Sequence, residues 1–263
     1  MLLSVFLTGT WFAGTAATTA GTTRPVTLDS LLEEMVERDA LARFPEPGFR
    51  LRQASSYNRA SKTPDDPAGW FHNKDNNTSD RDQNFIRVEQ NGGRREWVLM
   101  DDEGPGAIVR TWMPWRGQAK PTTTSIIRFY LDGAAAPALE GNMFELFQGK
   151  GLVPFPLAHE SLRSAVSFFP IPYSKSCKVT VSELPFFYQI TYREYPDGTP
   201  VQSFRMMDFE AASAVIKATC KTLLDPQDKF GAQAVVIDGP LAPKGQKSVE
   251  LPAGTGALRT LSV

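Results

Sequence analysis

The chain has 263 residues, of which 41% are hydrophobic and 22% are charged, the balance of an ordinary globular protein. Its 28 lysines and arginines oppose 29 aspartates and glutamates, so the formal net charge is -1. Because no basic excess exists to displace counterions from phosphates, nucleic acid is excluded as an expected partner. The 17 phenylalanines, 20 glycines and 20 prolines favour strands and turns over a helix bundle.

The first 22 residues are apolar and rich in small side chains, and no charge occurs before Arg24. This pattern predicts a signal peptide with its apolar core over residues 2–13, although the usual positive charge at the start is missing. A mis-set start codon is the alternative interpretation. We therefore expect a secreted or periplasmic protein. No later run approaches the ~20 apolar residues of a membrane span, so no membrane partner is expected.

Two helices are predicted from the spacing of apolar residues. The first covers residues 29–41, where Ser30 followed by Glu33 matches a capping box and Pro45 ends the pattern. The second covers residues 209–224 and is stopped by Pro226.

Short β-like runs separated by turns fill most of the remaining chain. Residues 83–89 alternate, Asn91-Gly-Gly93 is a strong hairpin signal, and residues 94–100 form the returning strand. Further strands are predicted over residues 107–113, 124–131, 165–169, 177–181 and 186–192. Since strands and helices do not alternate regularly, we predict an all-β jelly-roll β-sandwich with an N-terminal helix and one late helix.

One short pattern occurs twice. Gly104-Pro-Gly-Ala-Ile-Val-Arg-Thr-Trp112 is matched near the C-terminus by Gly254-Thr-Gly-Ala-Leu-Arg-Thr-Leu261. Either the recurrence is chance, or the second copy is the beginning of a second jelly roll. The second interpretation divides the chain into a signal peptide (1–22), a first jelly-roll domain (28–245) and the start of a truncated second one (246–263).

Cys177 and Cys220 are the two cysteines of the chain. In an exported protein they form a disulfide if their positions allow it, and otherwise they are two buried thiols. The sequence leaves both alternatives open.

No motif for a common cofactor is present. The chain lacks a phosphate-binding loop, a dinucleotide-binding glycine pattern and a nucleophile elbow. The two histidines, His72 and His159, do not stand at metal-ligand spacing. We therefore expect no cofactor and no metal.

Three polar stretches are candidates for chemistry. The first runs from Ser55 to Asp75 and mixes aromatic rings with amides and carboxylates, which suits a sugar site, although a solvated loop is the alternative. The second is Asp101-Asp102-Glu103, where clustered carboxylates suit general acid catalysis but also cap turns. The third is Asp132 with Glu140 and Glu145 downstream, where Asp132-Gly133 is first a hairpin signal.

Seven motifs in order resemble glycoside hydrolase family 172, which is also known as domain of unknown function 2961. The resemblance extends over residues 28–261. The motifs are Ser55-Ser-Tyr-Asn-Arg59, Trp70 with Asn73 and Asp75, Glu96-Trp-Val-Leu-Met-Asp101, Gly104-Pro-Gly-Ala-Ile-Val-Arg110, Arg128-Phe-Tyr-Leu-Asp-Gly133, Phe169-Pro-Ile-Pro-Tyr-Ser-Lys-Ser-Cys177 and Tyr188-Gln-Ile-Thr-Tyr-Arg193.

The resemblance implies two jelly rolls in tandem, assembled into homo-trimers or higher oligomers, that act on furanose-containing oligo- or polysaccharides. It also implies a retaining mechanism with two glutamates about 5 Å apart. The two glutamate motifs of the family belong to its second jelly roll and are missing here, so the catalytic residues are unknown and the chain is expected to be inactive alone. The resemblance implies substrate-side or interface roles for Ser56, Tyr57, Arg59, Trp70, Asn73 and Asp75.

Two functional interpretations follow. In the first, the chain is the N-terminal half of a furanoside-cleaving hydrolase. In the second, it is a non-catalytic carbohydrate-binding or oligomer-assembly module that presents Trp70, Trp112 or Trp115 to a polysaccharide.

Overall fold

The computed structural model describes residues 24–59, 63, 65, 84–115, 125–226, 239–240, 242–248, 250 and 253. The expected signal peptide and the repeat at residues 254–261 lie outside these residues. Trp70, His72, Asn73 and Asp75 also lie outside them.

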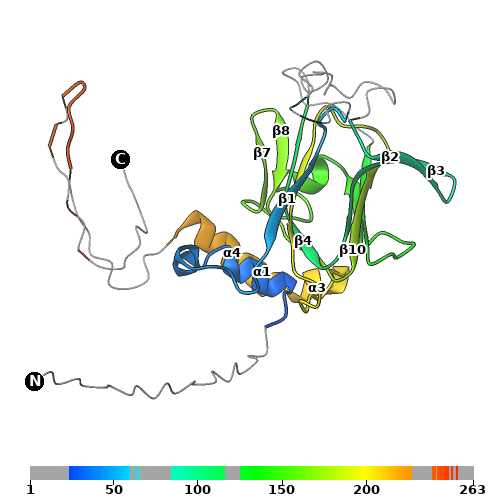
Figure 1. Ribbon diagram of the computed structural model, residues 1–263, viewed down its shortest axis with the longest axis horizontal. Helices are drawn as coiled ribbons and strands as arrows, with labels where there is room; N and C mark the ends of the chain where they lie inside the picture. Colours follow the sequence, from blue (N-terminus) through cyan, green and yellow to red (C-terminus); the bar gives the residue numbers. More distant parts are fainter. Residues whose placement is uncertain are drawn as a thin grey trace, which may run out of the picture.

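Two antiparallel sheets pack face to face, as Figure 1 shows, so the prediction of an all-β, jelly-roll-like sandwich is confirmed. The five-stranded sheet has the spatial order β2 (Arg87–Asn91), β3 (Arg94–Glu103), β10 (Ser176–Val181), β5 (Ile126–Leu131) and β6 (Leu139–Asn142). The second sheet has the order β1 (Arg50–Ser55), β11 (Gln189–Glu194), β4 (Gly106–Pro114), β8 (Ser164–Ser167) and β7 (Ala158–Ser161), with β9 (Ile171–Tyr173) paired to β4.

Inward-facing side chains of both sheets form one main hydrophobic core. Phe129 and Val179 of the five-stranded sheet and Ile108 and Ile190 of the other are all 0% exposed and belong to the same cluster. Burying each such side chain is worth about 1.5–3 kcal/mol, which makes this contact the main stabilising term of the domain.

The predicted hairpin at Asn91 is confirmed. Asn91 pairs directly with Arg94, so Gly92 and Gly93 form a two-residue turn between β2 and β3. Their φ angles are 57° and 81°, the left-handed values that this hairpin turn requires and that glycine adopts most easily. The strand before the turn begins at Arg87 and not at residue 83, whereas β3 continues three residues past the prediction to Glu103.

The N-terminal helix is shorter than predicted, because α1 covers Leu28–Glu34 and a separate 3-10 helix η1 covers Arg38–Ala42. Its capping box is also different. Thr27 is the cap, and it exchanges two hydrogen bonds with Ser30 at 3.1 Å and 2.8 Å. Glu33, which the sequence suggested as the box partner, instead accepts a hydrogen bond from Arg24 at 2.9 Å.

The late helix is divided in two. Helix α3 (Met206–Ala211) and helix α4 (Ser213–Leu224) meet at Ala212, which is 1% exposed and belongs to the main core. Helix α4 packs on α1, where the Thr219 hydroxyl donates to the Leu32 carbonyl at 3.2 Å. Among the described helices, none is long and apolar enough to cross a membrane.

Both cysteines are free thiols in this structure. Cys177 lies on β10 and is fully buried in the core, where desolvation raises the pKa of its thiol. Cys220 lies half-buried on α4. The two alternatives left open by the sequence are therefore resolved in favour of unpaired thiols.

Gly106 provides a test of the packing where β4 begins. A Cβ atom at this position would overlap the Tyr173 ring and lie 2.7 Å from the Arg193 carbonyl oxygen. We expect Gly106→Ala to lower the free energy of unfolding by about 1–3 kcal/mol, the usual range for overpacking, in a urea denaturation experiment. Gly48→Ala is the control, because its nearest contact would be 4.0 Å away. Equal effects of the two substitutions would contradict the interpretation.

Candidate functional site

The loop after β1 brings three of the predicted substrate-side residues together. Ser56 is 6% exposed, its amide donates to the Tyr188 carbonyl at 3.2 Å, and its hydroxyl accepts from the Tyr188 amide at 3.2 Å. The Arg59 guanidinium lies 4.8 Å from the centre of the Tyr57 ring, which is 54% exposed. Ser56 therefore anchors the loop, while Tyr57 offers an accessible ring with a cation over one face.

Arg59 also reaches inward, because its Nη2 atom lies 3.4 Å from the Tyr188 hydroxyl. Burial raises the pKa of Tyr188, so this hydroxyl stays protonated at neutral pH. The loop is thus tied to the end of β11 through both backbone and side chains. The remaining predicted residues of this stretch, Trp70, Asn73 and Asp75, lie outside the described residues.

The three acids at the end of β3 do not form one site. Asp101 points to the outer face and binds Arg87 at 2.5 Å, whereas Asp102 points inward and accepts from the Tyr173 hydroxyl at 2.7 Å. Side chains of successive strand residues point to opposite faces, so the sheet separates these two carboxylates. Burial raises the pKa of Asp102, and Glu103 is exposed at the strand end. The structure therefore assigns Asp101 and Asp102 to cross-strand pairs.

Asp132 is a structural residue of the turn after β5. Its φ angle is 56°, and its carboxylate accepts hydrogen bonds from the amides of Lys175 at 2.7 Å and Ser174 at 3.1 Å, and from the Ser203 hydroxyl. Burial raises the pKa of Asp132, but these donors outweigh it, and the net pKa is lowered. Glu140 has a different partner, Arg128, at 3.0 Å.

Asp132→Asn tests this role through pH. Asparagine tolerates the positive φ and keeps one acceptor oxygen, so the loss is confined to the charge and the second acceptor. We expect a loss of ~1–2 kcal/mol of unfolding free energy at pH 7. A carboxylate with a lowered pKa stabilises the fold above its unfolded pKa of about 3.9, and this contribution is lost as pH falls through the folded value.

The measurement is urea denaturation at pH 7 and pH 3, with Asp197→Asn on an exposed turn as the control. The difference in unfolding free energy between the wild type and Asp132→Asn should be smaller at pH 3 than at pH 7. An equal difference in unfolding free energy at pH 7 and pH 3 would show that the charge of Asp132 does not stabilise the fold.

Of the aromatic residues suggested as a sugar platform, Trp115 is excluded by its position. It is 5% exposed and packs edge-to-face on Phe144, with 5.4 Å between the ring centres. Trp112 is half-buried and belongs to neither hydrophobic cluster.

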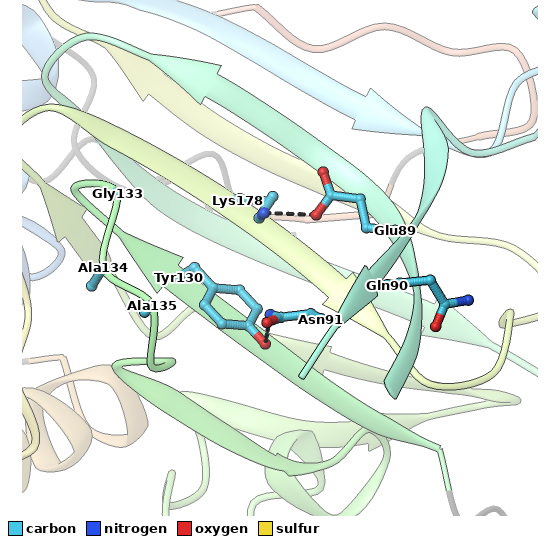
Figure 2. Close-up of a pocket in the computed structure, with 8 residues that line it drawn as sticks. All are labelled: Glu89, Gln90, Asn91, Tyr130, Gly133, Ala134, Ala135 and Lys178. Atoms are coloured by element: carbon cyan, nitrogen blue, oxygen red, sulfur yellow. Dashed lines mark hydrogen bonds and ion pairs between the residues drawn. The ribbon is translucent and has the colours of Figure 1, made fainter. Parts of the chain in front are cut away.

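A polar groove that the sequence analysis did not identify opens on the outer face of the five-stranded sheet. Figure 2 shows it between the β2–β3 hairpin and the turn after β5. Its volume is about 440 Å³, which suits a small ligand. The lining residues are Glu89, Gln90, Asn91, Tyr130, Gly133, Ala134, Ala135 and Lys178.

The charges in this groove are paired. The Lys178 ammonium lies 2.7 Å from a Glu89 oxygen and 5.5 Å from the centre of the Tyr130 ring. The hydrogen bond from Lys178 lowers the pKa of Glu89, and Arg87 adds to the same effect. The groove is thus polar but close to neutral, which favours an uncharged ligand rich in hydroxyl groups over an ion.

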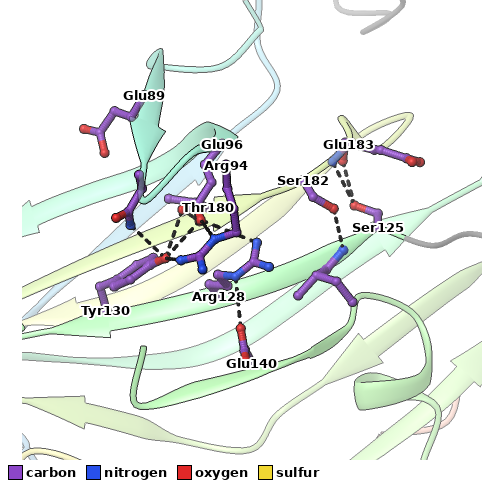
Figure 3. Close-up of polar contacts among 12 residues, drawn as sticks. Glu89, Arg94, Glu96, Ser125, Arg128, Tyr130, Glu140, Thr180, Ser182 and Glu183 are labelled. Carbon is purple, nitrogen blue, oxygen red and sulfur yellow. Dashed lines mark hydrogen bonds and ion pairs between the residues drawn. The ribbon is translucent and has the colours of Figure 1, made fainter. Parts of the chain in front are cut away.

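A buried carboxylate, Glu96, is bonded to the groove residue Tyr130, and Figure 3 shows the polar contacts around it. Glu96 is 0% exposed and accepts hydrogen bonds from the hydroxyls of Tyr130 at 3.0 Å and Thr180 at 2.8 Å, and from Arg94 at 3.0 Å. The Arg128 guanidinium lies 3.5 Å away. Burial raises the pKa of Glu96, but these partners outweigh it, so the net pKa is lowered and the side chain is ionised at neutral pH.

The network continues into the groove wall, because Asn91 donates to the Tyr130 hydroxyl at 3.0 Å. Two groove residues are therefore held by one buried anion. Such fixed geometry reduces the entropy that a ligand would otherwise have to overcome on binding.

Glu96→Gln is expected to lower the free energy of unfolding by about 2–3 kcal/mol, because it removes the buried carboxylate that binds Arg94 and Arg128 and leaves Arg128 with Glu140 as its ion-pair partner among the described residues. Chemical denaturation at pH 7 is the measurement. Glu103→Gln, on an exposed carboxylate of the same strand, should change stability little. If both variants unfold like the wild type, Glu96 is not the hub of this network.

Comparison with known families settles the membership of the chain. The model of the "GH172 first beta-sandwich domain" matches residues 47–212, which is more than half of the chain. The chain belongs to glycoside hydrolase family 172. The GH172 match begins just before β1 and ends at Ala212, so it includes every strand of both sheets and excludes α1 and α4. No curated protein matches the chain.

Proposed function

We propose that this chain supplies the first sandwich of a furanoside-acting glycoside hydrolase and does not cleave glycosidic bonds by itself. The observation that carries the proposal is the GH172 match, which falls on the first sandwich domain. The furanoside class rests on the seven motifs described above.

The chemistry of the described acids supports the second half of this proposal. Retaining hydrolysis requires two carboxyl groups about 5 Å apart on either side of one anomeric carbon. Asp101, Asp102 and Asp132 are each occupied by hydrogen-bond donors of neighbouring strands or turns. Glu96 is fully buried beneath its own partners. In the part of the chain that the structure describes, these four acids serve the fold.

In this proposal the loop after β1 is the substrate-side element. Tyr57 presents an exposed ring and Arg59 a guanidinium beside it, a pair that suits the C–H face and the hydroxyl groups of a sugar. The family resemblance assigns Trp70, Asn73 and Asp75, which lie outside the described residues, to the same role. Export to the periplasm or the medium is supported by residues 1–22, and assembly into trimers or higher oligomers by the family resemblance.

A second candidate function, a non-catalytic carbohydrate-binding module, is favoured by the polar groove. Its charges are paired and its walls are held by Glu96, so it fits a neutral sugar without offering a free acid for catalysis. This function requires no second domain.

The test is an activity screen of the purified chain on nitrophenyl α-arabinofuranoside and on fructofuranosyl disaccharides. We expect no product above the buffer control, since Glu96, Asp101, Asp102 and Asp132 of the described residues are each held by partners within the fold. Robust turnover that is lost in Asp102→Asn would overturn the proposal and assign catalysis to the first sandwich. Turnover that survives this substitution would also overturn it, because some other acids of the chain would then be catalytic.

A further inference from the structure

The sheet of β1, β11, β4, β8 and β7 has an outer face that carries a row of side chains outside the two hydrophobic clusters. Thr111 and Met113 of β4 are buried, so Trp112 between them points to the outer face. The register places Trp112 beside Gln189 of β11 on one side and Val166 of β8 on the other. Trp112 thus lies at the centre of this face.

The same register extends the row across all five strands. Gln189 pairs with Ser55 at one end, and Val166 pairs with His159 at the other. Neighbouring strands lie about 4.8 Å apart, so the row spans roughly 20 Å. This is the scale of a short oligosaccharide lying across the strands.

The His159 end of the row is an exposed aromatic cluster. The His159 ring stacks on Phe168 with 6.2 Å between ring centres, and Phe155 packs edge-on against it at 6.1 Å. Phe168 is 37% exposed and Phe155 is 55% exposed. Neither belongs to a hydrophobic cluster of the described residues, so their rings are not needed to build the core. Exposed rings gathered in this way mark a binding surface.

Arg110 supplies a positive charge on the same face. Arg110 lies next to a bulge in the β4–β11 pairing. Its Nη1 atom donates a hydrogen bond to the neutral side chain of Gln189 at 2.9 Å. Among the described ion pairs, Arg52, Arg87 and Arg193 each bind a carboxylate, but none involves Arg110. A half-buried guanidinium whose partner is a neutral amide retains an unmet preference for an anion.

We propose that this face binds an oligosaccharide that carries a carboxylate. Trp112, His159 and Phe168 stack on the C–H faces of successive sugars, and Arg110 pairs with the carboxylate. Gln189 and Ser55 supply neutral hydrogen bonds to hydroxyl groups. The inference goes beyond both candidate functions above, because it concerns the outer face of the other sheet and an acidic ligand, and it depends neither on furanoside turnover nor on the polar groove.

The mixture of groups distinguishes this ligand from a protein partner. Helix α1 already covers the other end of the face, where Leu31 packs on Ala107 and Val109. The remaining strip holds a hydroxyl at Ser55 and an amide at Gln189 on one side of the Trp112 ring, and the buried Val166 and the His159 ring on the other. Sugars present C–H patches and hydroxyl groups that suit such a mixture. Charge complementarity with Arg110 then selects an acidic sugar over a neutral one.

The experiment measures binding of trigalacturonate and of neutral maltotriose to the full chain by isothermal titration calorimetry. We expect the acidic trisaccharide to bind at least tenfold more tightly than the neutral one. Arg110→Gln should abolish this preference, and Trp112→Ala should weaken binding of the acidic sugar at least tenfold. Phe168→Ala serves as a second aromatic variant, because its exposed ring can be removed without disturbing the core.

Two matched controls keep the result specific. Arg52→Gln removes a charge from the same sheet, and Phe44→Ala removes a fully exposed ring that is not part of the row. Neither should change the affinity by more than twofold. Absence of binding to both sugars, or binding that Arg110→Gln and Phe168→Ala leave unchanged, would overturn the proposal. Self-association of the chain that Phe168→Ala abolishes, without sugar binding, would instead identify the face as a protein interface.

Discussion

Strand β10 lies between β3 and β5, and its pairing with both decides which side chains of the five-stranded sheet enter the core. Its residues 177, 179 and 181 point between the sheets, so Lys178 and Thr180 point outward. A bulge in β3, opposite Val179 and Thr180 of β10, takes up the extra residue Leu99 and keeps Glu96 beside the Thr180 hydroxyl. The core, the buried carboxylate and the groove all depend on this one register.

The hairpin turn and most strands could be predicted from the sequence because neighbouring residues alone determine them. Gly92 and Gly93 specify their hairpin by backbone freedom alone, and most strands coincide with runs of β-branched or aromatic residues. Ser30 is a good cap residue by itself, but Thr27 is the cap and α1 begins at Leu28. Val26, just before the cap, pairs with Val201, a long-range contact that the local sequence does not reveal. The short strands β6, β7 and β9 have three or four residues each, too few to show a period.

The candidate sites were less accessible to sequence reasoning because they depend on pairing between distant segments. Ser56, Tyr57 and Arg59 are close in the chain, so their cluster was foreseeable. The groove joins segments around Asn91, Tyr130 and Lys178, and nothing in the sequence gives the strand order that brings them together. Asp101 and Asp102 do not form one site because adjacent residues of a strand point to opposite faces of the sheet. This could have been predicted from the sequence for any strand that includes both residues, as β3 does.

Helix α1 lies outside the family match, yet it is packed into the sandwich from two directions. Leu31 contributes to a small cluster with Ala107 and Tyr195, and Thr219 of α4 is bonded to its backbone. A recombinant protein limited to residues 47–212 would lack α1, and the apolar surface of β4 that α1 covers would then be exposed. Such a shortened domain would present bare apolar surface to solvent and aggregate, so recombinant versions of this sandwich should retain the flanking helices.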